Sequence, residues 1–321
     1  MDMEGKPQSP YAKHFPLILE YSIEPPQKCT PLDIELIRIN KEKEILNLLS
    51  CLTNYRFFNY DSSMSGWGVI LPNKLVEEMT EAEIKRMNEQ ESCLFIGGYV
   101  YDGLKQDLFI DCFSDYAIEI AYKEAQMHEY YMDNPVDNDR KEITFPNTIS
   151  YAIDCYYRLS ENTRRKVNSS IYLACDGMDI SEHKRSLSFL SYVSAIEGLL
   201  ELETNDGEIK FACNSCKSIS SSPYTCPQCN RPIWGIKQKF INFLSTFVAG
   251  SEKSKKIYRD IYNLRCKITH TGKLFIGDYE LFLDEGYAER ENKDWLMRLK
   301  TLQLFRISLN SWLRYANKKK T

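Results

Sequence analysis

The sequence predicts a multidomain α+β protein, in which an N-terminal mixed α/β domain is followed by an all-α helical bundle. Three observations predict this class. Short runs rich in β-branched and aromatic residues dominate the first part, long segments of helical periodicity dominate the second, and two CxxC pairs interrupt the second. The segment 133–139 is rich in Pro, Asn and Asp, which break regular structure, so we place the domains at 1–145 and 146–321.

In residues 1–145, predicted strands alternate with predicted helices, and turn-forming residues such as Pro25-Pro26 and Asp102-Gly103 separate them. The predicted strands are 15–23, 32–39, 55–60, 67–71, 93–101 and 108–112, and the predicted helices are 41–52, 81–88 and 115–132. This domain indicates no family, so sensing, partner binding and regulation all stay open as its role.

In residues 146–321, apolar residues recur with helical spacing, which predicts a bundle. The predicted helices are 148–160, 161–175, 182–203, 235–248, 252–270 and 291–317. The last helix is amphipathic and ends in Lys318-Lys319-Lys320. We favour the last helix of the bundle over a helix lying on a membrane surface.

The charge of the chain is unevenly distributed. The net charge is −4, yet residues 207–273 contain twelve Lys and Arg against three acids, which gives +9 there and −13 elsewhere. A concentrated basic segment in an acidic protein favours a polyanion partner such as RNA, although a solvated basic helix face is the alternative.

No apolar run approaches the ~20 residues of a membrane span, and no signal peptide begins the sequence. We therefore expect a cytoplasmic protein without a membrane partner. The absence of a phosphate-binding loop motif argues against nucleotide hydrolysis.

Four of the eleven cysteines form the two CxxC pairs, Cys213 with Cys216 and Cys226 with Cys229, nine residues apart. Two such pairs supply the four thiolates that a tetrahedral Zn²⁺ prefers. The sequence therefore predicts one structural zinc per chain, in a zinc ribbon inserted at residues 204–232. An RNA contact, a protein contact, a brace for the bundle and a DNA contact stay open as its role. The seven other cysteines are interpreted as buried free thiols.

Arg265 and His270 close the basic helix, and Gly272 follows them. Arginine presents a charged planar fork to phosphate oxygens, and histidine exchanges protons near neutral pH. If the helix ends near His270, the imidazole can turn toward Arg265. Glu197 lies on the apolar face of an earlier helix, where it could orient His270, pair with Arg265, or form an ordinary structural ion pair.

Two stretches resemble the HEPN superfamily, especially its ApeA-like branch. The first, Tyr192-Val-Ser-Ala-Ile-Glu-Gly-Leu199, is similar to the family's helix with an Ala-x-Glu-x-Leu core. The second, Ile261-Tyr-Asn-Leu-Arg-Cys-Lys-Ile-Thr-His-Thr-Gly272, is similar to its Arg-x(4–6)-His motif followed by glycine. A CxxC insert between these helices also occurs in relatives. The resemblance covers about residues 146–317.

The resemblance implies a homodimer or higher homo-oligomer in which Arg/His pairs meet at an interface. It also implies a metal-independent endoribonuclease of a prokaryotic defence or toxin-like system. Arg265 would then stabilise the phosphorane, His270 would transfer a proton, and Glu197 would support them. We expect Arg259, Lys267 and Lys273 to contact RNA, and a regulatory protein partner stays open. The alternative is a non-catalytic RNA- or protein-binding scaffold.

Overall fold

The computed structural model of the protein describes residues 19, 21–24, 26, 28, 30–58, 80–82, 123–132, 143–203, 211–213, 215–220, 225–231, 233, 235–279 and 286–318. The chain forms two compact units. One comprises Met1–Leu46, Phe58–Ala121 and Val136–Lys141, and the other comprises Asn47–Phe57, Tyr122–Pro135 and Glu142–Thr321. The second is called the helical unit below, because it contains the long helices that the sequence predicts.

Helix α1, Pro31–Leu52, corrects one prediction for the N-terminal region. The predicted helix 41–52 is confirmed, but the predicted strand 32–39 is wrong, since these residues form the first half of α1. A reciprocal cap starts the helix: the Asp33 carboxylate accepts from the Thr30 N–H at 2.8 Å, and the Thr30 hydroxyl accepts from the Asp33 N–H at 3.2 Å. Arg38 pairs with glutamates on both sides along the helix. These local interactions outweigh the alternating apolar pattern that suggested a strand.

The predicted helix 115–132 is confirmed at Met127–Met132 and wrong at Lys123–Ala125, and residues 115–122 lie outside the described residues. Strand β1, Lys123–Ala125, pairs in parallel with strand β2, Thr144–Pro146, and only α3, Met127–Met132, is helical. The pairing partner lies about twenty residues away, so local periodicity cannot reveal it. The described residues of the predicted strands 15–23 and 55–60 form no strand. The remaining predictions for residues 1–145 fall wholly or largely outside the described residues.

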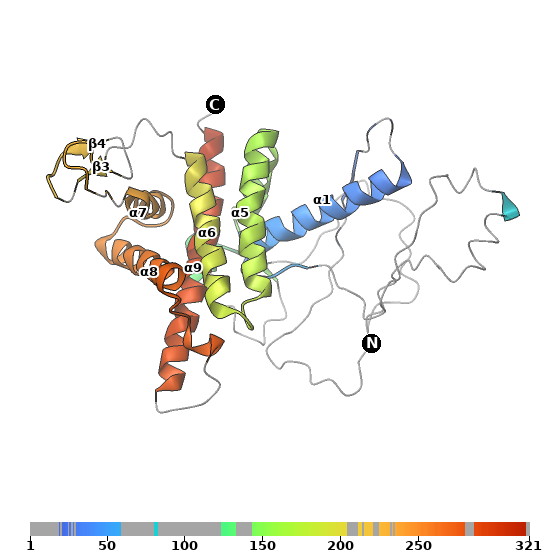
Figure 1. Cartoon of the computed structure of the whole chain (residues 1–321). Helices are drawn as coiled ribbons and strands as arrows, with labels where there is room; N and C mark the ends of the chain where they lie inside the picture. Colours follow the sequence, from blue (N-terminus) through green and yellow to red (C-terminus); the bar gives the residue numbers. More distant parts are fainter. Residues whose placement is uncertain are drawn as a thin grey trace. The chain divides into compact units, whose positions relative to one another are not determined.

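The bundle confirms the six helices predicted for the C-terminal region, and the described chain is mostly helical (Figure 1). They are α4 (Ile149–Tyr157), α5 (Glu161–Asp179), α6 (Arg185–Glu203), α7 (Gly235–Phe247), α8 (Glu252–Thr271) and α9 (Tyr287–Lys318). Helices α5, α6 and α9 run side by side, and α7 and α8 pack against each other beside α6 and α9. The apolar face of α9 is buried in the shared core, as expected for a bundle helix. Among the described helices, none has the length and apolarity needed to cross a membrane.

Two glycines allow α5 and α6 to approach closely. A Cβ added at Gly198 of α6 would lie 2.3 Å from the Ser170 hydroxyl of α5, and one at Gly177 of α5 would lie 2.7 Å from the Tyr192 ring of α6. Contacts this short mean that the facing side chain or the helix must shift before a larger residue fits at either position. The two glycines therefore allow close packing of α5 against α6, the helix that carries Glu197.

The helical unit also contains segments that precede residue 146. Leu48, Cys51 and Leu52 lie in its core. The last carbonyls of α1 are bonded by buried side chains: Arg306 donates to the Ser50 carbonyl at 3.0 Å, and the Tyr131 hydroxyl donates to the Leu52 carbonyl at 2.6 Å. Buried carbonyls require such partners, so these segments are integral to the unit.

The chain that leaves α8 is anchored to two helices. The Phe275 N–H donates to the Ser186 hydroxyl at 2.7 Å, and the Phe275 ring packs edge-on against Phe189. In the short 3₁₀ helix η2, Ile276–Asp278, the Asp278 carboxylate accepts from the N–H groups of Arg185 and Ser186 at 2.7 Å each. It thereby caps the N-terminus of α6. These contacts hold the chain directly after α8, and they therefore limit where the C-terminal turn of α8, which contains His270, can lie.

Candidate functional site

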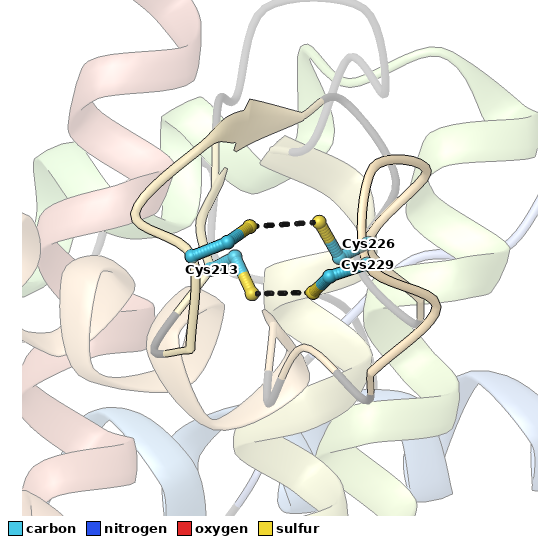
Figure 2. A group of neighbouring side chains, drawn as sticks. Cys213, Cys226 and Cys229 are labelled. Carbon is cyan, nitrogen blue, oxygen red and sulfur yellow. Dashed lines mark hydrogen bonds between the residues drawn. The ribbon is translucent and has the colours of Figure 1, made fainter.

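The four cysteines of the two CxxC pairs, which lie in the segment that joins α6 to α7 along the chain, converge on one point. Their sulfur atoms all lie within 4.8 Å of one another. Cys213 Sγ lies 3.5 Å from Cys229 Sγ, and Cys216 Sγ lies 3.6 Å from Cys226 Sγ. Figure 2 shows the side chains of Cys213, Cys226 and Cys229 pointing toward one another. Four thiolates at ~2.3 Å from a tetrahedral metal would be roughly 3.8 Å apart, so the cluster fits a metal ion with little movement.

The two pairs form matching turns around this point. In each, the N–H of the first cysteine donates to the carbonyl five residues later, at 2.8 Å for Cys213 and 2.9 Å for Cys226. The residue after the second cysteine donates back to the first cysteine's carbonyl at 2.9 Å, and it has a positive φ: 60° at Lys217 and 53° at Asn230. Such turns direct backbone N–H groups at the sulfur atoms, as the 3.4 Å contact from the Ser215 N–H to Cys213 Sγ illustrates.

The metal module, which we define as the described residues from Phe211 to Ile233, has little apolar core of its own. Its strands β3, Phe211–Ala212, and β4, Ile219–Ser220, form a two-stranded antiparallel sheet. Its buried cluster contains Cys213, Cys226 and Ile233. A cluster this small contributes little burial energy, so the module depends on its cysteines for a defined structure.

Arg265 and Glu197 are brought together by packing of α8 against α6. Arg265 Nη2 lies 3.5 Å from Glu197 Oε2, and their side chains are 27% and 21% exposed. The Arg265 guanidinium also lies 5.9 Å from the centre of the Tyr262 ring, one turn earlier on α8. Among the described residues, this long contact is the one hydrogen bond that the Arg265 side chain makes, so most of its five N–H donors have no partner there. The pairing of Glu197 with Arg265 was one of the alternatives left open by the sequence.

The environment of this pair changes two pKa values. Burial raises the pKa of the Glu197 carboxyl above its usual range, and the nearby Arg265 guanidinium opposes that shift. Burial, together with the Glu197 charge, raises the pKa of the Tyr262 hydroxyl to about 12. Tyr262 therefore stays protonated at neutral pH and presents a neutral ring beneath the guanidinium.

His270 lies on a different face of α8 from Arg265. The helix continues through Thr271, and Gly272 caps it in the left-handed region with φ 67°, so His270 occupies a regular helical position. Five residues at 100° each place His270 about 140° around the helix from Arg265. The predicted helix end beside His270, with Gly272 in the left-handed region, is confirmed, but within one chain this end does not bring His270 to the face of α8 that carries Arg265. Among the described residues, the exposed His270 side chain has no hydrogen bond or ion pair.

The exposed face of α8 gathers the other predicted residues. Arg259 and His270 are eleven residues apart, which leaves them about 20° apart around the helix, and Lys267 lies within about 80° of Arg259. All three side chains are exposed, and so is Lys273 just beyond the helix. Arg259 approaches Glu252 at 3.9 Å, a long and exposed ion pair. His270 thus shares a face with two of the predicted RNA contacts, and Arg265 lies on the opposite face.

Comparisons with known families, with curated proteins and with solved structures found no match for this chain. The likeness to the HEPN superfamily therefore rests on the two quoted stretches and stays a prediction.

Three residues near these sites were missed from the sequence. Tyr262 was detectable in principle, because a residue three positions before Arg265 shares its helix face. Ser218 lies two residues after Cys216, and its hydroxyl lies 3.1 Å from Cys226 Sγ. This hydrogen bond is the main reason that the pKa of the Cys226 thiol is lowered to about 6. Asp278 gives no local signal, since its partners precede it by about ninety residues.

Proposed function

We propose that this chain is a metal-independent endoribonuclease of the HEPN type, which acts on RNA as a homodimer in a prokaryotic defence or toxin-like setting. The observation that carries the proposal is the placement of Arg265. It is held on α8 by Glu197 and Tyr262, it keeps free donors, and its helix carries His270 in the last turn. A guanidinium and an imidazole on one helix suit the charge and the proton transfers of phosphodiester cleavage.

In the proposed reaction, the ribose 2′-oxygen attacks the adjacent phosphorus and the bond from phosphorus to the 5′-oxygen breaks. His270 of the second copy accepts the 2′-hydroxyl proton and then donates it to the leaving 5′-oxygen. The products are a 2′,3′-cyclic phosphate and a 5′-hydroxyl. Arg265 stabilises the negative charge on the phosphorane, and Glu197 holds Arg265 in place.

The separation of Arg265 and His270 supports a site shared between two copies. Within one chain they lie on nearly opposite faces of α8, so one phosphate cannot contact both. In the proposed dimer the second copy supplies the imidazole that acts beside Arg265. In this arrangement Arg259, Lys267 and Lys273 bind the flanking phosphates.

The metal in the proposal is one structural zinc per chain, bound by Cys213, Cys216, Cys226 and Cys229. The sulfur spacing and the all-thiolate donor set favour zinc. Four protein ligands close the coordination sphere, so the metal would hold the module together and would not activate water.

The alternative is a non-catalytic scaffold that binds RNA or a protein. One observation favours it: Arg265 is already engaged by Glu197 and Tyr262, and His270 makes no contact with any of them. In that case Arg265–Glu197 is a structural ion pair and the exposed face of α8 is a binding surface.

Cleavage of labelled single-stranded RNA and tRNA tests the proposal. Wild type, Arg265→Ala, His270→Ala and the control His183→Ala would carry one zinc per chain without magnesium, at concentrations that span dimerisation. His183 is exposed in the same unit and lies off α8. We expect His183→Ala to cleave like wild type, and His270→Ala to lose about 10²- to 10⁴-fold in rate with RNA affinity retained.

The products and the controls decide between the two functions. Ends with 2′,3′-cyclic phosphate from wild type, absent with His270→Ala, would support the composite site. Equal cleavage by wild type and His270→Ala would overturn it. RNA binding without cleavage at any concentration would favour the scaffold.

A further inference from the structure

The two cysteine turns match in their backbones but differ at one side chain. Two residues after the second cysteine of each pair, the first turn has Ser218 and the second has Arg231. The carbonyls of these two residues accept equivalent hydrogen bonds, from the N–H groups of Cys213 and Cys226. The side chains differ in what they reach, since Arg231 is exposed and Ser218 is half-buried at the cluster.

The Ser218 hydroxyl lies beside one edge of the sulfur cluster. Its oxygen is 3.0 Å from Cys216 Sγ and 3.1 Å from Cys226 Sγ, and these two sulfurs are 3.6 Å apart. One sulfur comes from each turn. Along the other edge, Cys213 to Cys229, the described residues provide no hydroxyl contact of this kind. The hydroxyl therefore bridges the two turns on one side of the cluster only.

If the cluster binds a metal, a hydroxyl in this position stabilises the sulfur ligands. Four thiolates around Zn²⁺ carry a net charge of −2, and hydrogen bonds to the sulfurs stabilise that charge. Cys226 is fully buried, so protein groups alone can provide such bonds there. Cys216 is exposed, and the hydroxyl lies between it and the buried ligand.

We propose that Ser218 is a positioning residue of the metal centre, whose hydroxyl shares its one hydrogen between the thiolates of Cys216 and Cys226 in a bifurcated hydrogen bond and so raises the affinity for zinc. The inference rests on the metal centre of the proposed function and is independent of ribonuclease activity. Ser218 of the first turn would thereby help to hold Cys226, the buried ligand of the second turn.

Zinc affinity of the full chain tests this role, measured under reducing conditions by competition with a chromogenic chelator. Ser218→Ala removes the hydroxyl, and Ser218→Thr keeps it. Ser215→Ala is the matched control, because the exposed Ser215 contacts Cys213 Sγ through its backbone N–H. We expect about a tenfold weaker zinc affinity for Ser218→Ala, at the low end of the usual effect of outer-shell partners. Ser215→Ala should stay close to wild type, and Ser218→Thr should recover most of the loss.

Cobalt(II) substitution gives a second readout that a general loss of stability would not produce. The thiolate-to-cobalt charge-transfer band should shift in Ser218→Ala and keep its position in Ser215→Ala. Unchanged zinc affinity and an unchanged cobalt spectrum in Ser218→Ala, with a metal-loaded wild type, would overturn the role of Ser218 alone. A wild-type chain that binds no metal would overturn the metal centre and this inference together.

Discussion

The bundle and the metal module are held together by different forces. The bundle core contains buried apolar side chains from α4 to α9 and from the end of α1. The module buries Cys213, Cys226 and Ile233 beside four converging sulfurs. Burial stabilises the bundle by about 25 cal/mol per Å² of apolar surface, a source of energy that the module largely lacks. We therefore expect that the stability of each region can be changed with little effect on the other.

Removal of the zinc that we propose for the cysteine cluster should separate the two regions most strongly. Structural zinc contributes on the order of 10 kcal/mol to the folding of small modules, and the module has little else. We expect a strong chelator to make the module sensitive to proteases and to leave the helical signal in circular dichroism nearly unchanged. A collapse of the helical signal together with metal loss would contradict the separation of the two regions.

The converse experiment perturbs the bundle core. Leu199 on α6 is fully buried, so Leu199→Ala leaves a cavity and should cost about 2–5 kcal/mol of unfolding free energy. The control Leu187→Ala changes a side chain on the same helix that is 49% exposed, and it should cost below ~0.5 kcal/mol. Denaturant unfolding measures both, and zinc stoichiometry should stay at one per chain. Loss of zinc from Leu199→Ala under native conditions would mean that the bundle supports the module.

The features that could be predicted from the sequence are those that depend on a local pattern of residues. Amphipathic periodicity located the helices of the bundle, because a helix buried on one face repeats apolar residues with its own period. Cysteine spacing located the sulfur cluster, because ligand geometry constrains that spacing. The first half of α1 was missed because its apolar residues alternate as in a strand, whereas the Thr30–Asp33 cap and the Arg38 ion pairs favour a helix.

The features that sequence reasoning missed depend on distant partners. Strand β1 exists through its pairing with β2, and Asp278 acts on Arg185 and Ser186 far upstream. The directions in which side chains point also could not be predicted from the sequence. The residues Arg265 and His270 were chosen for their chemistry, yet their placement on different faces follows from how far α8 continues. Helix ends are set by caps and tertiary packing, which a motif alone does not specify.

Both regions contain a residue in the left-handed backbone region, and substitutions there should have small effects of opposite sign. The bundle places glycine in the left-handed region at Gly272, φ 67°, where an added Cβ would meet nothing within 4 Å. The module places Lys217, φ 60°, and Asn230, φ 53°, in the same region. A residue with a Cβ costs about 1–2 kcal/mol there, so Gly272→Ala should destabilise the bundle by about 1 kcal/mol.

Lys217→Gly should have the opposite sign in the module. Relief of the left-handed strain is partly offset by the greater freedom of glycine in the unfolded chain, about 0.5–1 kcal/mol, so the net gain is at most ~1 kcal/mol. Loss of the lysine charge beside an anionic metal centre would obscure this gain, and Lys217→Gln serves as the reference because it loses the same charge. We expect Lys217→Gly to bind zinc up to about fivefold more tightly than Lys217→Gln. Asn230→Gly should gain less than that, because asparagine tolerates the left-handed region better than lysine. Equal zinc affinity of Lys217→Gly and Lys217→Gln would contradict this prediction. It would mean that metal binding sets the conformation of the turn and that the backbone preference of residue 217 contributes nothing.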